Sequence, residues 1–76
     1  MPKITPVDWK TFEKFLLFVG CEFKRQKGDH KIYWRADINR PIVLPTYKEL
    51  PVFIIRNNIR TLGISQQEYV AILKKI

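Results

Sequence analysis

The chain has 76 residues, which is enough for one small domain with a thin core, and 46% of them are hydrophobic. Such an apolar content, with two Trp, three Tyr and five Phe, argues against intrinsic disorder. Fourteen basic side chains against seven acidic ones give a net charge of +7, which favours a polyanionic partner: nucleic acid, an anionic membrane or an acidic protein. A basic surface that serves only solubility is the alternative.

The single cysteine and the single histidine exclude an internal disulfide and argue against a zinc site. We therefore expect no metal and a cytoplasmic protein, with Cys21 as a small core residue. No secretory signal peptide is visible at the N-terminus. The longest apolar run, residues 15–19, is far shorter than the roughly 20 residues that a membrane span needs.

The first predicted element is a helix that begins near Thr5. Thr5 can cap this helix, Pro6 suits the first helical position, and Asp8 favours the positive helix end. Apolar residues follow at helical spacing, and Gly20 is expected to end the helix. The apolar face consists of Trp9, Phe12, Phe15, Leu16, Phe18 and Val19.

Three short strands are predicted next, at residues 22–27, 30–35 and 42–44. Phe23 is the apolar anchor of the first strand, and Gly28 and Asp29 form the turn that leads to the second. Pro41 and Pro45 bracket the third strand and favour an edge position. The short connections predict an antiparallel meander.

Side-chain alternation along the second strand leaves two arrangements open. One face carries His30, Ile32 and Trp34, and the other carries Lys31, Tyr33 and Arg35. If helices cover the first face, His30 lies at the rim of the core. If they cover the second, His30 and Trp34 stand on the open face, where Trp34 could stack on an unpaired base.

Two helices are predicted to close the chain. The first begins near Pro51 and ends at Gly63, with an apolar face of Val52, Ile55, Ile59 and Leu62. The second begins at Ser65, which forms a capping box with Glu68. The order predicts an α+β fold over residues 1–76, α-β-β-β-α with a short extra C-terminal helix. Helices cover one face of a three-stranded antiparallel sheet, as in a double-stranded-RNA-binding domain.

The basic segment at residues 24–31 is the best candidate for chemistry, because nucleotide-binding glycine motifs and paired carboxylates are absent from the sequence. RNA cleavage needs a group that takes a proton from a 2′-hydroxyl and cations that stabilise charge on the phosphate. His30 could be the base or the acid, and Arg25, Lys27 and Lys31 could hold the phosphate. A lone histidine is nevertheless more often a structural or surface residue.

The segment 20–33 resembles the signature of the HicA (YcfA-like) family, most closely in the run Arg25, Gln26, Lys27, Gly28, Asp29 and His30. The later Ile-Val-Leu-Pro at residues 42–45 and the Gly-Ile-Ser at residues 63–65 are similar to the family's third strand and to the end of its closing helix. The resemblance implies a cytoplasmic mRNA interferase, the toxin of a type II toxin–antitoxin system, without a cofactor. It also implies His30 as the catalytic residue and a HicB-type antitoxin as the partner.

The RNA-binding residues predicted from the basic segment and the aromatic strand are Lys24, Arg25, Lys27, Gly28, Lys31, Trp34 and Arg35. Three positions depart from the family pattern. Asp29 replaces a serine and could orient the imidazole or favour its protonated form. Tyr47 stands where the family often has histidine, and Phe53-Ile54 replaces a Gly-Thr pair. Asp29 and Tyr47 are candidate orienting or acid groups.

Two other functions remain open. A non-catalytic RNA-binding module would bind RNA with a steep salt dependence and release no cleavage products. A basic protein-interaction domain would bind an acidic protein and have no affinity for RNA.

Overall fold

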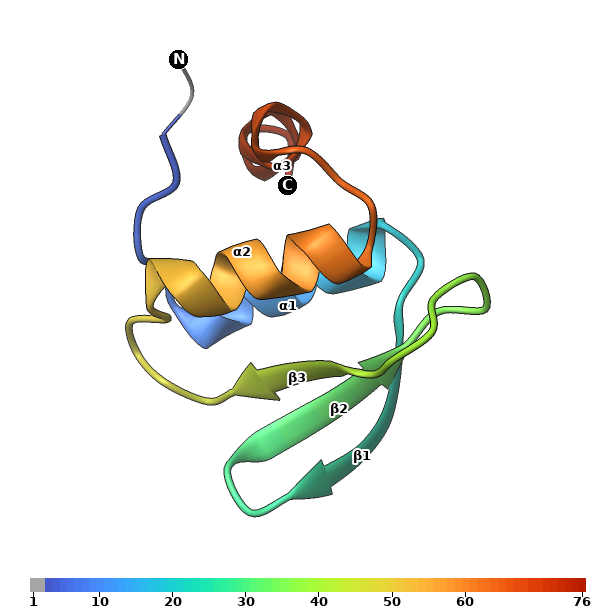
Figure 1. The fold of residues 1–76 in the computed structure, drawn as a ribbon. Coiled ribbons are helices and arrows are strands. Elements are labelled where there is room, and N and C mark those ends of the chain that lie inside the picture. The colour runs from blue at the N-terminus through green and yellow to red at the C-terminus, as the bar shows by residue number, and fades with distance from the viewer. Residues whose placement is uncertain (1–2) are drawn as a thin grey trace.

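The computed structural model describes residues 3–76 of the chain. The elements follow in the order α1 (Trp9–Phe18), β1 (Glu22–Lys27), β2 (His30–Trp34), β3 (Ile42–Pro45), α2 (Val52–Thr61) and α3 (Gln66–Leu73). The sheet is one layer, α1 and α2 lie on one of its faces, and α3 lies beyond these two helices, away from the sheet (Figure 1). This arrangement confirms the predicted α+β fold with its double-stranded-RNA-binding-like order. Within the described residues, no helix is both long and apolar enough to cross a membrane.

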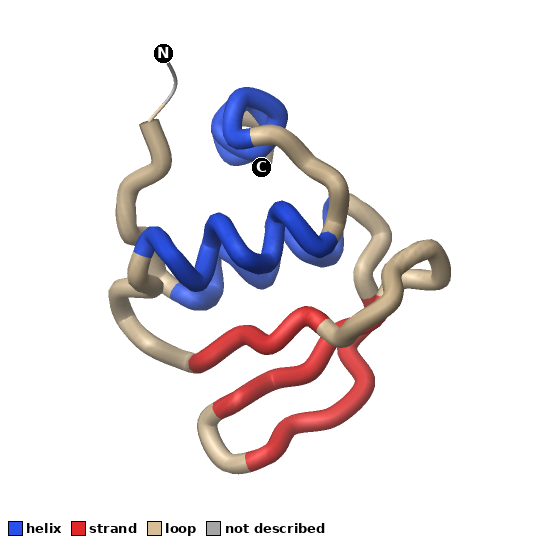
Figure 2. The backbone as a smooth tube through the Cα atoms, viewed as in Figure 1, coloured by secondary structure: helices blue, strands red, loops and turns tan. Residues whose placement is uncertain are grey.

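The three strands form the predicted antiparallel meander, with β2 in the centre (Figure 2). Along β1 and β2, Lys27 lies opposite His30 and Arg25 lies opposite Ile32. The register then shifts at Lys24, which forms a β-bulge. The β1–β2 turn contains Gly28 with a φ of +61°, a left-handed conformation that strains other residues.

The first helix begins later than the sequence predicted. Its N-cap is Asp8, whose carboxylate accepts a hydrogen bond from the Lys10 N–H at 2.8 Å, so the assignment of Thr5 as cap and of Pro6 as first helical residue was wrong. The physical reason is a β-bridge just before the helix. Leu50 donates its N–H to the Val7 carbonyl at 2.7 Å, and this pairing keeps the preceding residues extended.

The core lies between the sheet and the helices and extends up to α3. Phe12, Phe15 and Leu16 of α1 are fully buried, whereas Phe18 is 56% exposed and does not widen the apolar face as expected. The ring of Tyr69 on α3 packs edge-on against Phe15, with 4.8 Å between ring centroids. This contact helps to hold α3 against the helices.

Arg35 joins the ends of two helices to the sheet. Its Nη1 donates to the Val19 carbonyl at 3.1 Å and its Nη2 to the Leu62 carbonyl at 2.9 Å. These residues are the C-caps of α1 and α2, where carbonyls lack helical partners. Asp37 holds the guanidinium from the other side, with 2.6 Å between Nε and Oδ1.

Candidate active site around His30

The orientation of β2 places His30 on the open face of the sheet. Tyr33 is fully buried under the helices, and its hydroxyl donates to the Glu13 carboxylate on α1. The neighbouring Lys31 reaches the same carboxylate, with 2.6 Å between Nζ and Oε2. Because side chains alternate along a strand, His30 and Trp34 stand on the opposite, open face. Of the two arrangements that the sequence left open, the second is therefore present.

The Glu13 group explains how a tyrosine and a lysine are tolerated at the core. Burial alone would raise the pKa of Glu13, but hydrogen bonds from Lys31 and Tyr33 and the charge of Lys31 lower this pKa below its ordinary 4.5. Burial, and then the hydrogen bond to Glu13, raises the pKa of the Tyr33 hydroxyl. Glu13 is thus an ionised carboxylate that accepts hydrogen bonds from both Lys31 and Tyr33.

His30 begins β2 directly after the glycine turn and remains accessible. Its side chain is 45% exposed, and its Nδ1 lies 3.2 Å from Oδ1 of Asp29. Thr46 holds this turn in place, because its N–H and Oγ1 both donate to the Asp29 carbonyl, at 2.9 and 3.1 Å. The backbone that positions the imidazole is therefore fastened to the end of β3.

A cavity of about 240 Å³ opens beside His30. It lies between the end of β3 and α2, and it is lined by His30, Val43, Pro45, Ile54, Asn57 and Asn58. The residues that α2 contributes were missed by the sequence analysis. The run Ile54-Ile55-Arg56-Asn57-Asn58 carries polar side chains in the middle of the helix. This polarity was the one feature of the sequence that could have indicated a site on α2.

Two of the predicted cations share the face of His30. Lys27 is the cross-strand neighbour of His30, and Arg25 is the neighbour of Ile32 on the same face. Lys24 lies at the bulge and pairs with Glu22 at 3.1 Å. Gly28 shapes the turn between the strands. The structure thus brings Arg25 and Lys27 close to His30.

Lys31 and Arg35, which were also predicted to bind RNA, point to the helix-covered face. The Lys31 side chain is 18% exposed, with its Nζ 4.8 Å from the centroid of the Trp9 ring and 5.1 Å from that of Phe23. Arg35 is paired with Asp37, and the hydrogen bond to this carboxylate raises the pKa of Arg35. Both cations are engaged by contacts within the fold, and the proposed RNA-binding set does not include them.

Trp34 and Tyr47, the remaining candidates, do not line the cavity beside His30. Trp34 is partly buried and lines a separate cavity of about 470 Å³ with Lys24 and Arg35. Tyr47 follows β3, and its carbonyl accepts a hydrogen bond from the Trp9 N–H at 3.1 Å. At the two positions that differ from the family pattern on α2, Phe53 is exposed whereas Ile54 lines the cavity beside His30. Among residues 3–76, no cluster of His, Cys, Asp and Glu side chains could hold a metal ion.

Comparison with known protein families identifies a match to most of the chain. The family model described as the HicA toxin of bacterial toxin–antitoxin systems matches residues 9–64. This segment runs from the start of α1 to just beyond α2 and includes the whole sheet and His30. A comparison with curated proteins finds no match to the chain.

Proposed function

The chain belongs to the HicA toxin family of bacterial toxin–antitoxin systems, and on this basis we propose that it is an endoribonuclease acting on messenger RNA. The observation that carries the proposal is the position of His30 on the open face, half exposed, with Lys27 directly opposite it and a cavity at its side. A substrate can reach the imidazole there without displacing any part of the core.

In the proposed reaction, His30 acts as the general base or the general acid. As a base, it takes the proton of a ribose 2′-hydroxyl, whose oxygen then attacks the adjacent phosphorus while the bond to the 5′-oxygen breaks. The leaving oxygen takes up a proton, which His30 would supply if it were the acid. Arg25 and Lys27 stabilise the negative charge that builds on the phosphate, because their cationic groups lie on the same face.

We further propose that an antitoxin of the HicB type blocks this face. A toxin of a toxin–antitoxin system requires an antitoxin that neutralises it, and a protein that covered His30 together with the cations beside it would exclude RNA. The positive charge of the chain would accelerate the encounter with an acidic region of such a partner.

The test compares the wild-type chain with His30→Ala after induced expression. We expect the wild type to arrest growth and to fragment messenger RNA, and we expect the variant to do neither. Circular dichroism and retained RNA binding would show that the variant is folded. Equal toxicity and equal cleavage by His30→Ala would show that the catalytic assignment is wrong. Binding without cleavage by the wild type would identify an RNA-binding module instead.

A further inference from the structure

A second cavity adjoins the one beside His30. It has a volume of about 610 Å³, within the range of roughly 300–1,000 Å³ that is typical of ligand sites. Val43, Asn57 and Asn58 line both cavities, so the two lie side by side between β3 and α2. We call the combined feature the β3–α2 groove, which runs along the outer side of β3 from His30 to Arg40 and Arg60.

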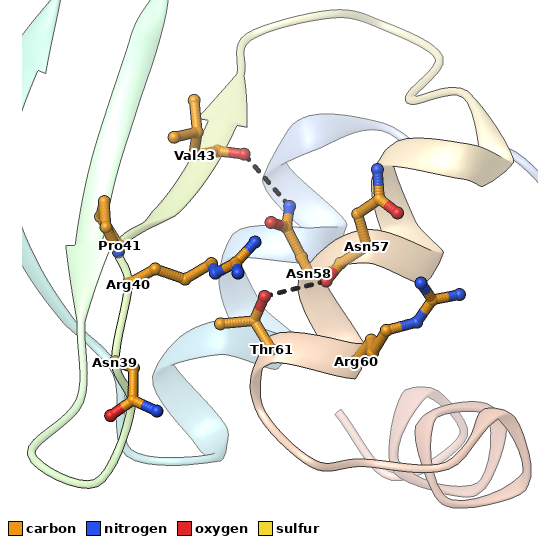
Figure 3. A pocket seen from close by; sticks show the side chains of 8 residues that line it. All are labelled: Asn39, Arg40, Pro41, Val43, Asn57, Asn58, Arg60 and Thr61. Atoms are coloured by element: carbon orange, nitrogen blue, oxygen red, sulfur yellow. Dashed lines mark hydrogen bonds between the residues drawn. The ribbon is translucent and has the colours of Figure 1, made fainter.

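The arginines and amides that line the second cavity suit a ligand that carries both negatively charged groups and hydrogen-bonding groups. Arg40 comes from the loop before β3 and Arg60 from α2, and Figure 3 shows Arg40 extending toward Asn58 and Thr61 of the helix. Within residues 3–76, neither guanidinium forms an ion pair, in contrast to Arg35. Guanidinium groups bind phosphate through two parallel hydrogen bonds, and amides can pair with base edges.

Asn58 keeps the groove at a fixed width. Its side chain is buried, and Nδ2 donates to the Val43 carbonyl at 3.1 Å, which ties α2 to the edge of β3 (Figure 3). The backbone on either side of the groove is therefore held in place before a ligand arrives, which lowers the entropic cost of binding.

The groove also has the length that a substrate strand requires. His30 is paired with Pro45, and Pro41 lies four residues before Pro45. At roughly 3.3 Å per residue, this stretch spans roughly 13 Å, enough for a few nucleotides of an extended strand. The surface beyond His30 thus continues in one direction as a basic, amide-lined channel.

From these observations we propose that the β3–α2 groove binds the part of a single-stranded RNA that flanks the cleaved bond, with Arg40 and Arg60 on its phosphates. This inference rests on the proposed function, because it assigns the groove to the substrate of His30. RNA is preferred to an acidic protein because the groove includes the cavity at His30 and combines cations with asparagine amides.

The experiment measures binding in a His30→Ala background, so that cleavage does not interfere. A fluorescently labelled, short single-stranded RNA of mixed sequence is titrated at several salt concentrations, and Arg40→Ala/Arg60→Ala is compared with its parent. We expect the dissociation constant to rise about tenfold per arginine. The slope of log affinity against log salt should become shallower by about 1.4, since each phosphate contact on a single strand contributes about 0.7.

The matched control is Lys74→Ala/Lys75→Ala, which removes the same charge just after α3. If the arginine variant binds RNA as this control does, the proposal is wrong. If it binds RNA normally but no longer binds the antitoxin, the groove is a protein-binding surface and the proposal is also wrong.

Cleavage assays with His30 restored separate the two proposals. Failure of the groove alone would leave wild-type cleavage intact and KM unchanged in the arginine variant. Failure of the proposed function would abolish cleavage in the wild type itself. The expected result is a raised KM with kcat retained, because Arg40 and Arg60 bind the strand away from the reacting atoms.

Discussion

At the scale of single residues, the contact between Asp29 and His30 is the most distinctive feature of the site. Both side chains are about half exposed, and 3.2 Å separates Oδ1 from Nδ1. Ion pairs with such exposure typically contribute about 0–1 kcal/mol. The carboxylate therefore orients the imidazole only weakly, and the backbone turn held by Thr46 has the larger part in placing His30.

We expect Asp29→Asn to reduce the rate of RNA cleavage by less than about fivefold, because an exposed pair of this kind is weak and the asparagine carbonyl can still accept from the ring. The measurement is single-turnover cleavage beside the wild type. Thr46→Val, which removes the Oγ1 hydrogen bond to the Asp29 carbonyl, serves as a comparison. A loss as large as that of His30→Ala would mean that Asp29 itself takes part in proton transfer.

The sequence identified His30 but could not decide which face it occupies. It is uncommon for a tryptophan to lie on the open face of a sheet while a tyrosine is buried in the core. Here the buried tyrosine is stabilised by Glu13, whose carboxylate accepts a hydrogen bond from the Tyr33 hydroxyl. Glu13 lies on α1 and Tyr33 on β2, so no local sequence pattern predicts their contact. The groove was missed for a similar reason, because Arg40 and Arg60 line one cavity only through the packing of α2 beside β3.

At the scale of elements, Glu13 is the polar link between α1 and β2. The carboxylate is about three-quarters buried and receives hydrogen bonds from both Lys31 and Tyr33. Removing its charge leaves a buried ammonium group without its partner, which is costly.

We expect Glu13→Gln to lower the free energy of unfolding at neutral pH by about 1–3 kcal/mol. The folded-state pKa of Glu13 is lowered, so its contribution is fully present above the ordinary value of 4.5 and is lost as the pH falls through the lower folded value. The difference between wild type and variant should therefore shrink in acid. Urea unfolding at about pH 7 and about pH 3.5 measures both effects.

The control for this prediction is Glu22→Gln. Glu22 pairs with Lys24 at the surface, and its loss should change stability by less than about 0.5 kcal/mol at either pH. Equal effects of the two substitutions would show that the Glu13 link does not stabilise the fold.

Element boundaries were predictable where local chemistry sets them. The glycine turn at Gly28 and the capping box of Ser65 and Glu68 were both read from the sequence, and both are present. The start of α1 was not predictable, because Thr5 has a suitable side chain but the bridge between Val7 and Leu50 prevents a helix there. Pairing with Leu50, which is distant in the sequence, outweighs the local preference for a helix N-cap at Thr5.

At the scale of the whole molecule, α3 completes the core from the side away from the sheet. Tyr69 is 99% buried by area and packs on Phe12 and Phe15, with 6.0 and 4.8 Å between ring centroids. Burial raises the pKa of its hydroxyl to about 12. Among the described residues, this hydroxyl has no hydrogen-bond partner, so the ring supplies the stabilisation.

We expect Tyr69→Ala to destabilise the protein by about 3–5 kcal/mol. A domain of this length has a total stability of only about 4–11 kcal/mol, so the loss would remove a large part of it. Tyr69→Phe keeps the ring and should be neutral or stabilising by up to about 1 kcal/mol. Thermal and urea unfolding of the two variants test this. Strong destabilisation by Tyr69→Phe would reveal a partner for the hydroxyl in solution.

The outer edge of β3 has a consequence for how the protein meets other chains. The Val43 carbonyl is occupied by Asn58, and Pro41 and Pro45 have no N–H to offer. At the other edge, β1 carries a bulge at Lys24 and charged side chains, both of which oppose pairing with a further strand. Both edges of the sheet therefore disfavour aggregation through pairing with the edge of another sheet. They equally disfavour the addition of a strand from another chain, whereas the open face and the groove carry no such obstacle.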